Sequence, residues 1–206
     1  MAAHPAISVT LRLGGSLLLG SIPFSNIIAR SITGYDLRTI GTGTVSPTNV
    51  YRLAGPRPFA TACLLDLAKG ATAAALVRDR HPVLMAAAAG LTVAGHNWSP
   101  FLRGAGGRGV LPATGVLLVA APPGATLIVG GVVLGYLMGD SAPACLVAEV
   151  LLTPVLAAIR GRSGALLGVV VAAPMLAKRL VGNGRPTADR SGDLYKTRII
   201  YDRDVR

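Results

Sequence analysis

The chain has 206 residues, of which 51% are hydrophobic and only 14% charged, and its mean hydropathy is +0.57. Soluble domains carry about 25% charged residues, so this composition excludes an ordinary soluble enzyme and predicts an all-α, multi-pass membrane bundle. The formal net charge of +11 does not indicate nucleic-acid binding, because the basic residues lie in short connections and in the tail rather than in an aromatic-rich soluble module.

Seven apolar segments follow one another and predict about seven transmembrane helices. Pro23, Phe24 and Ser25 end the first segment in a polar turn, and we expect a retained helix there rather than a cleaved signal peptide. Pro122 and Pro123 separate the fourth and fifth segments, which are short and predict either tilted helices or a re-entrant pair. The seven segments cover residues 7–29, 58–77, 83–99, 110–121, 124–138, 143–159 and 164–181.

The positions of lysine and arginine predict how these helices are oriented. With the N-terminus outside, fourteen basic residues fall in the inner connections and the tail, five fall outside, and Lys69 lies within a segment. The C-terminus is then cytoplasmic, and two glycine-rich connections, 33–55 and 100–109, share the cytoplasmic face. We expect a membrane domain over residues 1–184 and a polar cytoplasmic tail over 185–206 that is flexible or surface-bound.

The first glycine-rich connection reads DLRTIGTGTVSPTNVYR and offers the groups that a phosphate needs. Glycine turns present backbone amides, hydroxyl and amide side chains add hydrogen bonds, and Arg52 adds a guanidinium fork. An ordinary turn before an interfacial helix is the alternative reading of GTGT. The candidate residues are Gly41, Thr42, Gly43, Thr44, Ser46, Thr48, Asn49 and Arg52.

The second connection, GHNWSPFLRGAGGRG from Gly95 to Gly109, places polar, aromatic and glycine residues between two apolar segments. Irregular backbone at membrane depth needs protein or water to satisfy its amides, so we expect this run to line a polar site. Arg103 and Arg108 could hold a phosphorylated partner from the side opposite the first loop. His96 could act as a general base or could brace the loop, and we favour the second role.

Several polar or reactive residues stand inside the apolar segments. Asp66 and Lys69 are three residues apart on one helical face, so we expect them to pair, as a structural ion pair or as supports for a loop. Glu149 could be a functional interior group or could pair with a loop arginine. Cys63 and Cys145 lack metal-ligand spacing, and we expect neither a disulfide nor a metal site.

Taken in order, these motifs resemble the bacterial acyl-phosphate:glycerol-3-phosphate acyltransferases, the PlsY family. GSIPFS at 20–25 is similar to the end of that family's first helix, and GTGT with the following Thr-Asn and Arg is similar to its GSGN loop. DLAKG at 66–70 is similar to its D-x-x-K-G helix motif. The second connection is similar to its loop containing Gly-His and GGKG.

The resemblance implies a multi-pass enzyme of the bacterial inner membrane with an active site at the cytoplasmic face. It implies transfer of a fatty acyl group from acyl phosphate to the 1-hydroxyl of sn-glycerol 3-phosphate, giving lysophosphatidic acid and phosphate for phospholipid biosynthesis. These two substrates and membrane lipid are the implied partners, without a cofactor, a metal ion or an obligatory protein partner. Acyl phosphate is already activated, so positioning and charge neutralisation can supply catalysis without an acyl-enzyme.

The resemblance also implies roles for single residues. The catalytic or phosphate-binding set is Thr42, Arg52, His96 and Arg108, with Arg108 in place of the family's lysine. Asp66 and Lys69 are implied supports. The implied substrate-binding residues are Gly41, Gly43, Thr44, Thr48, Asn49, Asn97, Gly106, Gly107, Gly109 and Ser141.

Two other functions stay open from the sequence. The family's last helix carries a histidine and an asparagine that the corresponding stretch here, APMLAKRL, lacks, so the chain could acylate another polar acceptor. A small transporter or a non-catalytic membrane scaffold is the other alternative. The absence of an internal repeat and the gathering of charges at one face argue against transport.

Overall fold

All regular secondary structure in the computed structural model is helical over the residues that it describes, which are 5–41, 43–78, 81–183 and 192–202. Five of the described α-helices begin with a proline, which has no N–H to leave unpaired and a φ angle that suits the first helical position. The elements are α1 (Pro5–Ser21), α2 (Phe24–Thr33), η1 (Leu37–Thr39), α3 (Pro47–Ala54), α4 (Pro56–Ala75), α5 (Pro82–Asn97), η2 (Pro100–Leu102), α6 (Val110–Ala120), α7 (Pro122–Leu137), α8 (Ser141–Val181) and α9 (Gly192–Tyr201).

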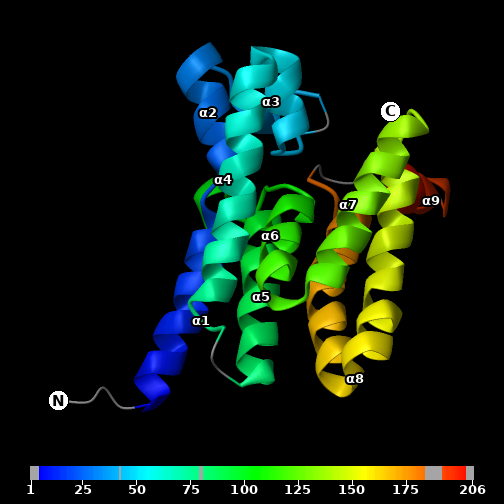
Figure 1. Ribbon diagram of the computed structural model, residues 1–206. Helices are drawn as coiled ribbons and strands as arrows, with labels where there is room; N and C mark the ends of the chain where they lie inside the picture. The colour runs from blue at the N-terminus through cyan, green and yellow to red at the C-terminus, as the bar shows by residue number, and fades with distance from the viewer. Residues whose placement is uncertain (1–4, 42, 79–80, 184–191, 203–206) are drawn as a thin grey trace.

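The long helices lie side by side, and α2 and α3 sit at the end of the bundle opposite the N-terminus (Figure 1). Helix α1 packs on α5, α4 on α6, and α7 on α8. Glycines allow α4 and α6 to touch closely, because a Cβ atom added at Gly70 would lie 2.1 Å from the carbonyl oxygen of Pro112. Gly115 of α6 is packed equally closely against the carbonyl oxygen of Leu67. Small residues therefore hold the bundle together, as in membrane proteins.

The predicted apolar segments are present, with two differences in how they are joined. The first segment does not end at Pro23, because helix α2 resumes at Phe24 and extends to Thr33 after a break at residues 22 and 23. The last two segments are the two arms of α8, which folds back at Gly161, where φ is 59° (Figure 1). The fourth and fifth segments are the separate helices α6 and α7, which meet at Ala121.

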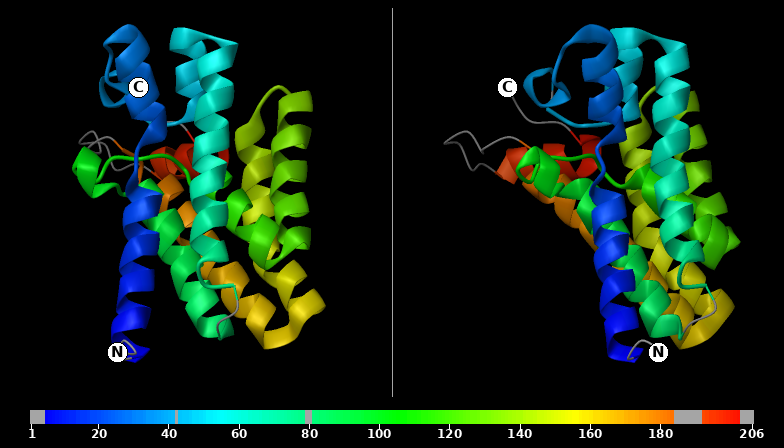
Figure 2. Two further views of the ribbon diagram at one scale, coloured as in Figure 1. Left: turned by 60° about the vertical axis from the view of Figure 1, so that its left-hand side comes forward. Right: turned by 90° about the vertical axis from the view of Figure 1, so that its left-hand side faces the viewer.

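Two further helices lie outside the seven predicted segments. Helix α3 follows the GTGT turn, as the alternative reading of that motif held, and it begins at Pro47 after the extended residue Ser46. Helix α9 forms in the tail that we expected to be flexible or surface-bound, and it packs on α8. Leu194 and Arg198 of α9 are each only 4% exposed, so burial of this helix holds the tail in place. Both views in Figure 2 show α9 beside the end of α8.

Large apolar side chains cover much of the outer surface of the bundle. Two stretches, Val9–Thr33 and Ser141–Val181, are long and apolar enough to cross a membrane, and α6 and α7 are shorter apolar helices. An outer face of this kind suits contact with lipid tails. Apolar residues that are more than half exposed include Leu11, Leu18, Leu64, Leu134, Val147 and Ile159.

Candidate active site

The two glycine-rich connections touch each other, as their predicted placement on one face suggested. The backbone N–H of Val45 in the first loop donates to the carbonyl oxygen of Gly106 in the second, at 3.1 Å. Arg38 donates to the carbonyl oxygen of Leu102 at 3.4 Å. These bonds make the two loops one structural unit.

Asp36 stabilises the segment of the first loop that carries Arg38, whose side chain contacts the second loop. Its carboxylate accepts from the backbone N–H of Arg38 at the start of η1, and it also pairs with the Arg38 guanidinium at 2.7 Å. The hydrogen bond from the Arg38 side chain lowers the pKa of Asp36 to about 2. Asp36 is therefore ionised at neutral pH and holds Arg38 beside the second loop.

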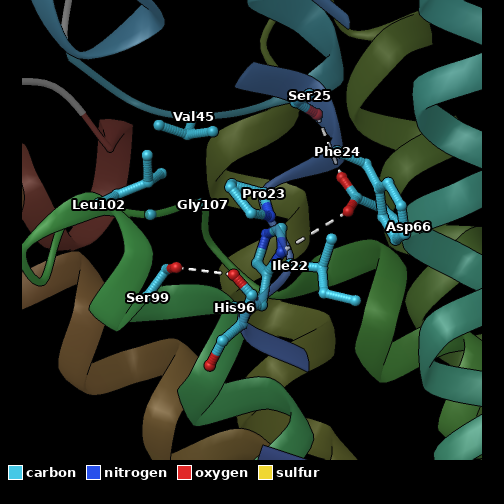
Figure 3. Close-up of a pocket in the computed structure, with 12 residues that line it drawn as sticks. Ile22, Pro23, Phe24, Ser25, Val45, Asp66, His96, Ser99, Leu102 and Gly107 are labelled. Carbon is cyan, nitrogen blue, oxygen red and sulfur yellow. Dashed lines mark hydrogen bonds and ion pairs between the residues drawn. The ribbon is translucent and has the colours of Figure 1, made fainter. Parts of the chain in front are cut away.

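A small pocket lies between the joined loops and the bend that separates α1 from α2 (Figure 3). Its empty volume is about 200 Å³. The bend contributes Ile22, Pro23 and Phe24, and the loops contribute Val45 and Gly107. Asp66 of α4 and His96 of α5 also line it, so the pocket is polar on one side.

Lys69 lies under this pocket with three partners around its ammonium group. Its Nζ atom donates to the carbonyl oxygen of Ile22 at 2.9 Å and lies 2.9 Å from Oδ1 of Asp66 and 2.8 Å from Nδ1 of His96. The expected pairing of Asp66 with Lys69 is thus present, and both side chains are 1% exposed. Ser25 completes the group by donating to Oδ2 of Asp66 at 3.1 Å.

This arrangement fixes which nitrogen of His96 carries the proton. An ammonium group can only donate hydrogen bonds, so the Nδ1 atom beside Lys69 must accept. Neutral His96 therefore carries its proton on Nε2, the nitrogen that faces Gly107. In this state His96 presents a hydrogen-bond donor to the loop and has no basic nitrogen facing it.

Gly106 and Gly107 are required by the close approach of the second loop to His96. A Cβ atom at Gly107 would lie 2.1 Å from Nε2 of His96, and one at Gly106 would lie 2.2 Å from the His96 carbonyl oxygen. The backbone N–H of Gly107 donates to that same carbonyl oxygen at 3.2 Å. His96 therefore lies against the loop, in a position that suits the bracing role, and its role in the reaction stays a prediction.

Two asparagines form hydrogen bonds near the second loop and the end of α8. Asn183 exchanges two hydrogen bonds with the backbone of Gly106, at 2.9 and 3.1 Å. Asn97 donates to the carbonyl oxygen of Pro174 at 2.7 Å, and its buried Oδ1 atom has no hydrogen-bond partner among the described residues. That oxygen faces Gly109, which directly precedes α6 and has a φ of 79°.

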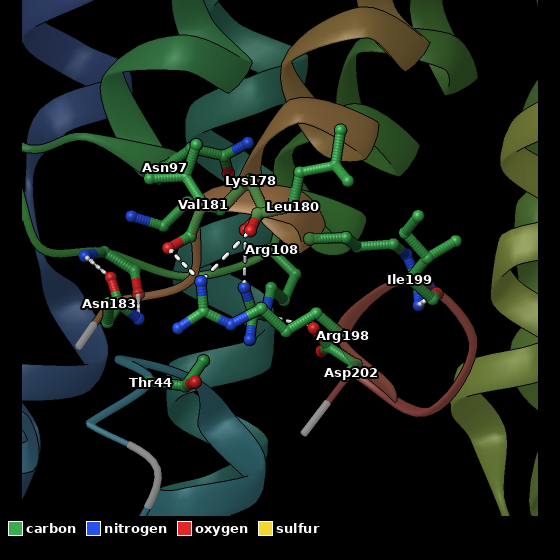
Figure 4. Close-up of polar contacts among 12 residues, drawn as sticks. Thr44, Asn97, Arg108, Lys178, Leu180, Val181, Asn183, Arg198, Ile199 and Asp202 are labelled. Atoms are coloured by element: carbon green, nitrogen blue, oxygen red, sulfur yellow. Dashed lines mark hydrogen bonds and ion pairs between the residues drawn. The ribbon is translucent and has the colours of Figure 1, made fainter. Parts of the chain in front are cut away.

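Arg108 lies where the second loop meets the ends of α8 and α9 (Figure 4). Its Nη1 atom donates to the carbonyl oxygen of Lys178 at 2.7 Å, and its Nε atom lies 2.7 Å from Oδ1 of Asp202. The Lys178 side chain is 1% exposed, and its ammonium group lies 5.3 Å from the ring centre of Trp98. Figure 4 also shows Arg198 and Thr44 in this region. The cations and loop amides gathered here are suited to binding an anion.

The remaining candidates of the first loop surround a short hydrogen-bonded chain. Asn49 donates to the carbonyl oxygen of Thr44 at 2.7 Å, and exposed Arg52 donates to Oδ1 of Asn49 at 3.3 Å. Gly41 and Gly43 adopt φ angles of 57° and 68°, which a turn of this kind requires. Thr48 is exposed on α3, and Thr42 lies outside the described residues.

Ser141 is the one candidate that the described contacts do not bring to these loops. It begins α8 and packs against Gly135 of α7, where an added Cβ atom would lie 2.4 Å from its Cα atom. Its predicted role in binding therefore has no support from this geometry.

Several residues that lie in or beside the site were not predicted from the sequence. Lys178 was counted only as a charge and Asp202 only as part of the tail, and Asn183 was given no role. Glu149 pairs with an arginine, as one alternative held, but the partner is Arg179 of the second arm of α8 rather than a loop residue. The two side chains form hydrogen bonds of 2.8 and 3.0 Å.

Comparison with known proteins relates the chain to one family. Residues 11–183 match the family model described as glycerol-3-phosphate acyltransferase. The glycerol-3-phosphate acyltransferase of Caulobacter vibrioides is 36% identical over 159 residues, which cover 75% of this chain and 72% of that enzyme. Glycerol-3-phosphate acyltransferase 2 of Moorella thermoacetica is 41% identical over 113 residues, or 54% of this chain. The chain spans 58% of the length of that second relative.

The fold is also similar to that of PlsY, described as an integral membrane glycerol 3-phosphate acyltransferase. Its crystal structure in the glycerol 3-phosphate form superposes with a TM-score of 0.75 at 27% identity, covering 84% of this chain and 88% of that chain. The lysophosphatidic acid form gives a TM-score of 0.73 at 25% identity. The likeness in fold therefore extends over most of the chain.

Proposed function

Because the chain belongs to the glycerol-3-phosphate acyltransferase family, we propose that it transfers an acyl group from acyl phosphate to the 1-hydroxyl of sn-glycerol 3-phosphate. The observation that carries this proposal is the junction of the two glycine-rich loops through Val45 and Gly106. That junction brings backbone amides, the donor face of His96 and the guanidinium of Arg108 to one part of the molecule. Such a site can hold a phosphorylated substrate and neutralise its charge.

The membrane arrangement is part of the same proposal. We place the chain in the bacterial inner membrane, with about seven crossings, the N-terminus outside and the C-terminus in the cytoplasm. The exposed apolar side chains along α1, α4, α7 and α8 support membrane insertion. The excess of basic residues at the end that carries the loops supports this orientation. The active site would then open to the compartment that holds glycerol 3-phosphate.

In the proposed reaction the oxygen of the glycerol hydroxyl attacks the acyl carbonyl carbon. The bond between this carbon and the bridging phosphate oxygen breaks, and phosphate leaves with the electron pair. Arg52, Arg108 and the loop amides, with Thr42 by the family resemblance, would bind phosphate oxygens and stabilise the departing charge. The proton from the hydroxyl would go to a substrate phosphate, whose second pKa is about 6.

His96 would act in this reaction as a hydrogen-bond donor. Its Nδ1 atom already accepts from Lys69 at 2.8 Å, and its protonated Nε2 faces the loop that would hold phosphate. A nitrogen that carries a proton cannot accept another, so neutral His96 is unsuited to be the general base at that position. This agrees with a mechanism that relies on positioning and charge.

The proposed activity can be tested with purified protein in detergent. Acyl phosphate and glycerol 3-phosphate should yield equal amounts of inorganic phosphate and lysophosphatidic acid, identified by mass spectrometry. Other polyol phosphates and unphosphorylated sugars, offered with the same donor, test whether the missing histidine and asparagine of the last helix have changed the acceptor. If the acyl group is transferred only to another acceptor, the chain acylates that acceptor in place of glycerol 3-phosphate. If it is transferred to no acceptor, both functions are rejected.

Replacing His96 tests the donor role against the general-base role. Glutamine cannot act as a base at neutral pH but can donate a hydrogen bond, so His96→Gln should keep kcat/KM within about tenfold of wild type. His96→Ala, which removes the donor, should lose about 10²-fold. Steady-state kinetics with both variants decides the matter. An equal loss of kcat/KM in His96→Gln and His96→Ala would contradict the donor role.

A further inference from the structure

Helix α9 lies beyond the region that matches the family model, which ends at residue 183, yet it is attached to the proposed active site. Its Arg198 donates to the carbonyl oxygens of Leu180 and Val181 at 3.2 and 3.1 Å. In return, Arg179 of α8 donates to the carbonyl oxygen of Ile199 at 3.3 Å. These bonds dock α9 on the end of α8 independently of any contact with Arg108.

Docking of α9 carries Asp202 to the guanidinium of Arg108. Helix α9 ends at Tyr201, and Asp202 turns the chain with a φ of 52°, a conformation that aspartate tolerates better than most residues. Its Oδ1 atom lies 2.7 Å from Nε of Arg108, and the two side chains are 22% and 15% exposed. The pair is thus largely shielded from water, which limits screening of its charges.

An ion pair and a hydrogen bond hold the Arg108 guanidinium from different directions. Asp202 contacts its Nε atom, and the carbonyl oxygen of Lys178 accepts from its Nη1 atom at 2.7 Å. The acid also offsets the repulsion among Arg108, Lys178 and Arg198, whose side chains gather at the end of α8 (Figure 4). The guanidinium is therefore held in one orientation before any substrate binds.

We propose that Asp202 is a positioning residue that orients Arg108 toward a substrate phosphate, which rests on the proposed function of Arg108 as a phosphate ligand. A planar guanidinium binds phosphate through two parallel hydrogen bonds, so its orientation matters. A lysine ammonium is a point charge whose donors rotate, and it needs no such support. Asp202, held in place by the docked helix α9, thus gives the arginine at position 108 the fixed orientation that a lysine there would not need.

The test combines substitutions at both positions. Asp202→Asn should raise KM for a phosphorylated substrate about tenfold while kcat changes less than threefold, and Asp202→Glu should restore most of the loss. In an Arg108→Lys background, Asp202→Asn should change KM less than twofold. Arg162→Ala, which removes an exposed charge beside the bend of α8 at Gly161, is the control and should leave KM unchanged.

Binding provides a readout that does not depend on turnover. Trp98 is the single tryptophan and lies beside Lys178, so its fluorescence should report glycerol 3-phosphate added to detergent-solubilised protein. Asp202→Asn should weaken this binding about tenfold without changing the unfolding temperature. An unchanged or tighter affinity, or an equal loss in the Arg108→Lys background, would overturn the positioning role. Binding without acyl transfer by wild type would reject the proposed reaction but not this role, and no binding would reject both.

Discussion

Replacement of Arg52 by alanine is expected to reduce kcat/KM by at least about 10²–10³-fold, the loss typical of removing one preorganised charged donor from a transition state. Arg52 is held against the glycine loop through Asn49, which in turn bonds to the carbonyl oxygen of Thr44. Its guanidinium is therefore placed beside the amides that would surround phosphate. The rate of phosphate release from acyl phosphate, measured at several concentrations of glycerol 3-phosphate, gives kcat and KM.

Two further variants separate loss of phosphate binding from loss of structure. Arg57→Ala removes an exposed arginine five residues away at the start of α4, and it should keep near-wild-type activity. Arg52→Lys keeps the positive charge but loses the forked guanidinium, so its kcat/KM should lie between those of wild type and Arg52→Ala. Because Arg52 is exposed, none of these changes should alter the free energy of unfolding by more than about 0.5 kcal/mol. Full activity of Arg52→Ala would remove Arg52 from the site.

The sequence predicted much of the helical framework because prolines, glycines and apolar runs act locally. The segment expected over 83–99 is α5 (Pro82–Asn97), and that expected over 58–77 is α4 (Pro56–Ala75). The meeting of the two glycine-rich loops was also predictable, because helices that cross the same layer bring alternate connections to one face. The helix α2 was missed because a proline can begin a new helix as well as end one.

The contacts that complete the site depend on tertiary structure and were not predictable. Glu149 finds Arg179 because α8 folds back at Gly161, and a hydropathy profile gives no information on which charged side chains then face each other. Asp202 reaches Arg108 because burial of Leu194 and Arg198 docks α9. Nothing in a short polar tail identifies this docking in advance. Composition predicted that tail to be flexible or surface-bound, and it gave no sign that part of it forms a helix packed on α8.

Lys69→Met is expected to destabilise the protein by about 3–5 kcal/mol, the range for breaking a buried ion pair by removing one partner. Asp66 would be left 1% exposed without its cation, with Ser25 as its remaining hydrogen-bond donor among the described contacts, and Nδ1 of His96 would lose the donor that fixes its tautomer. Unfolding in detergent can be followed with a thiol-reactive dye, because Cys145 is buried in the folded chain and Cys63 is partly buried.

The double variant Lys69→Met with Asp66→Asn gives the sharper test. It removes both charges, so it should regain at least half of the stability lost in Lys69→Met, since a neutral pair carries no uncompensated charge. Exposed Arg57, changed to methionine, is the control for the loss of a cation and should shift stability by less than about 0.5 kcal/mol. Recovery of stability without recovery of activity would separate the two roles of this pair, since His96 would still lack its hydrogen bond from Lys69. Equal stability of the single variant and wild type would show that the pair contributes nothing to folding.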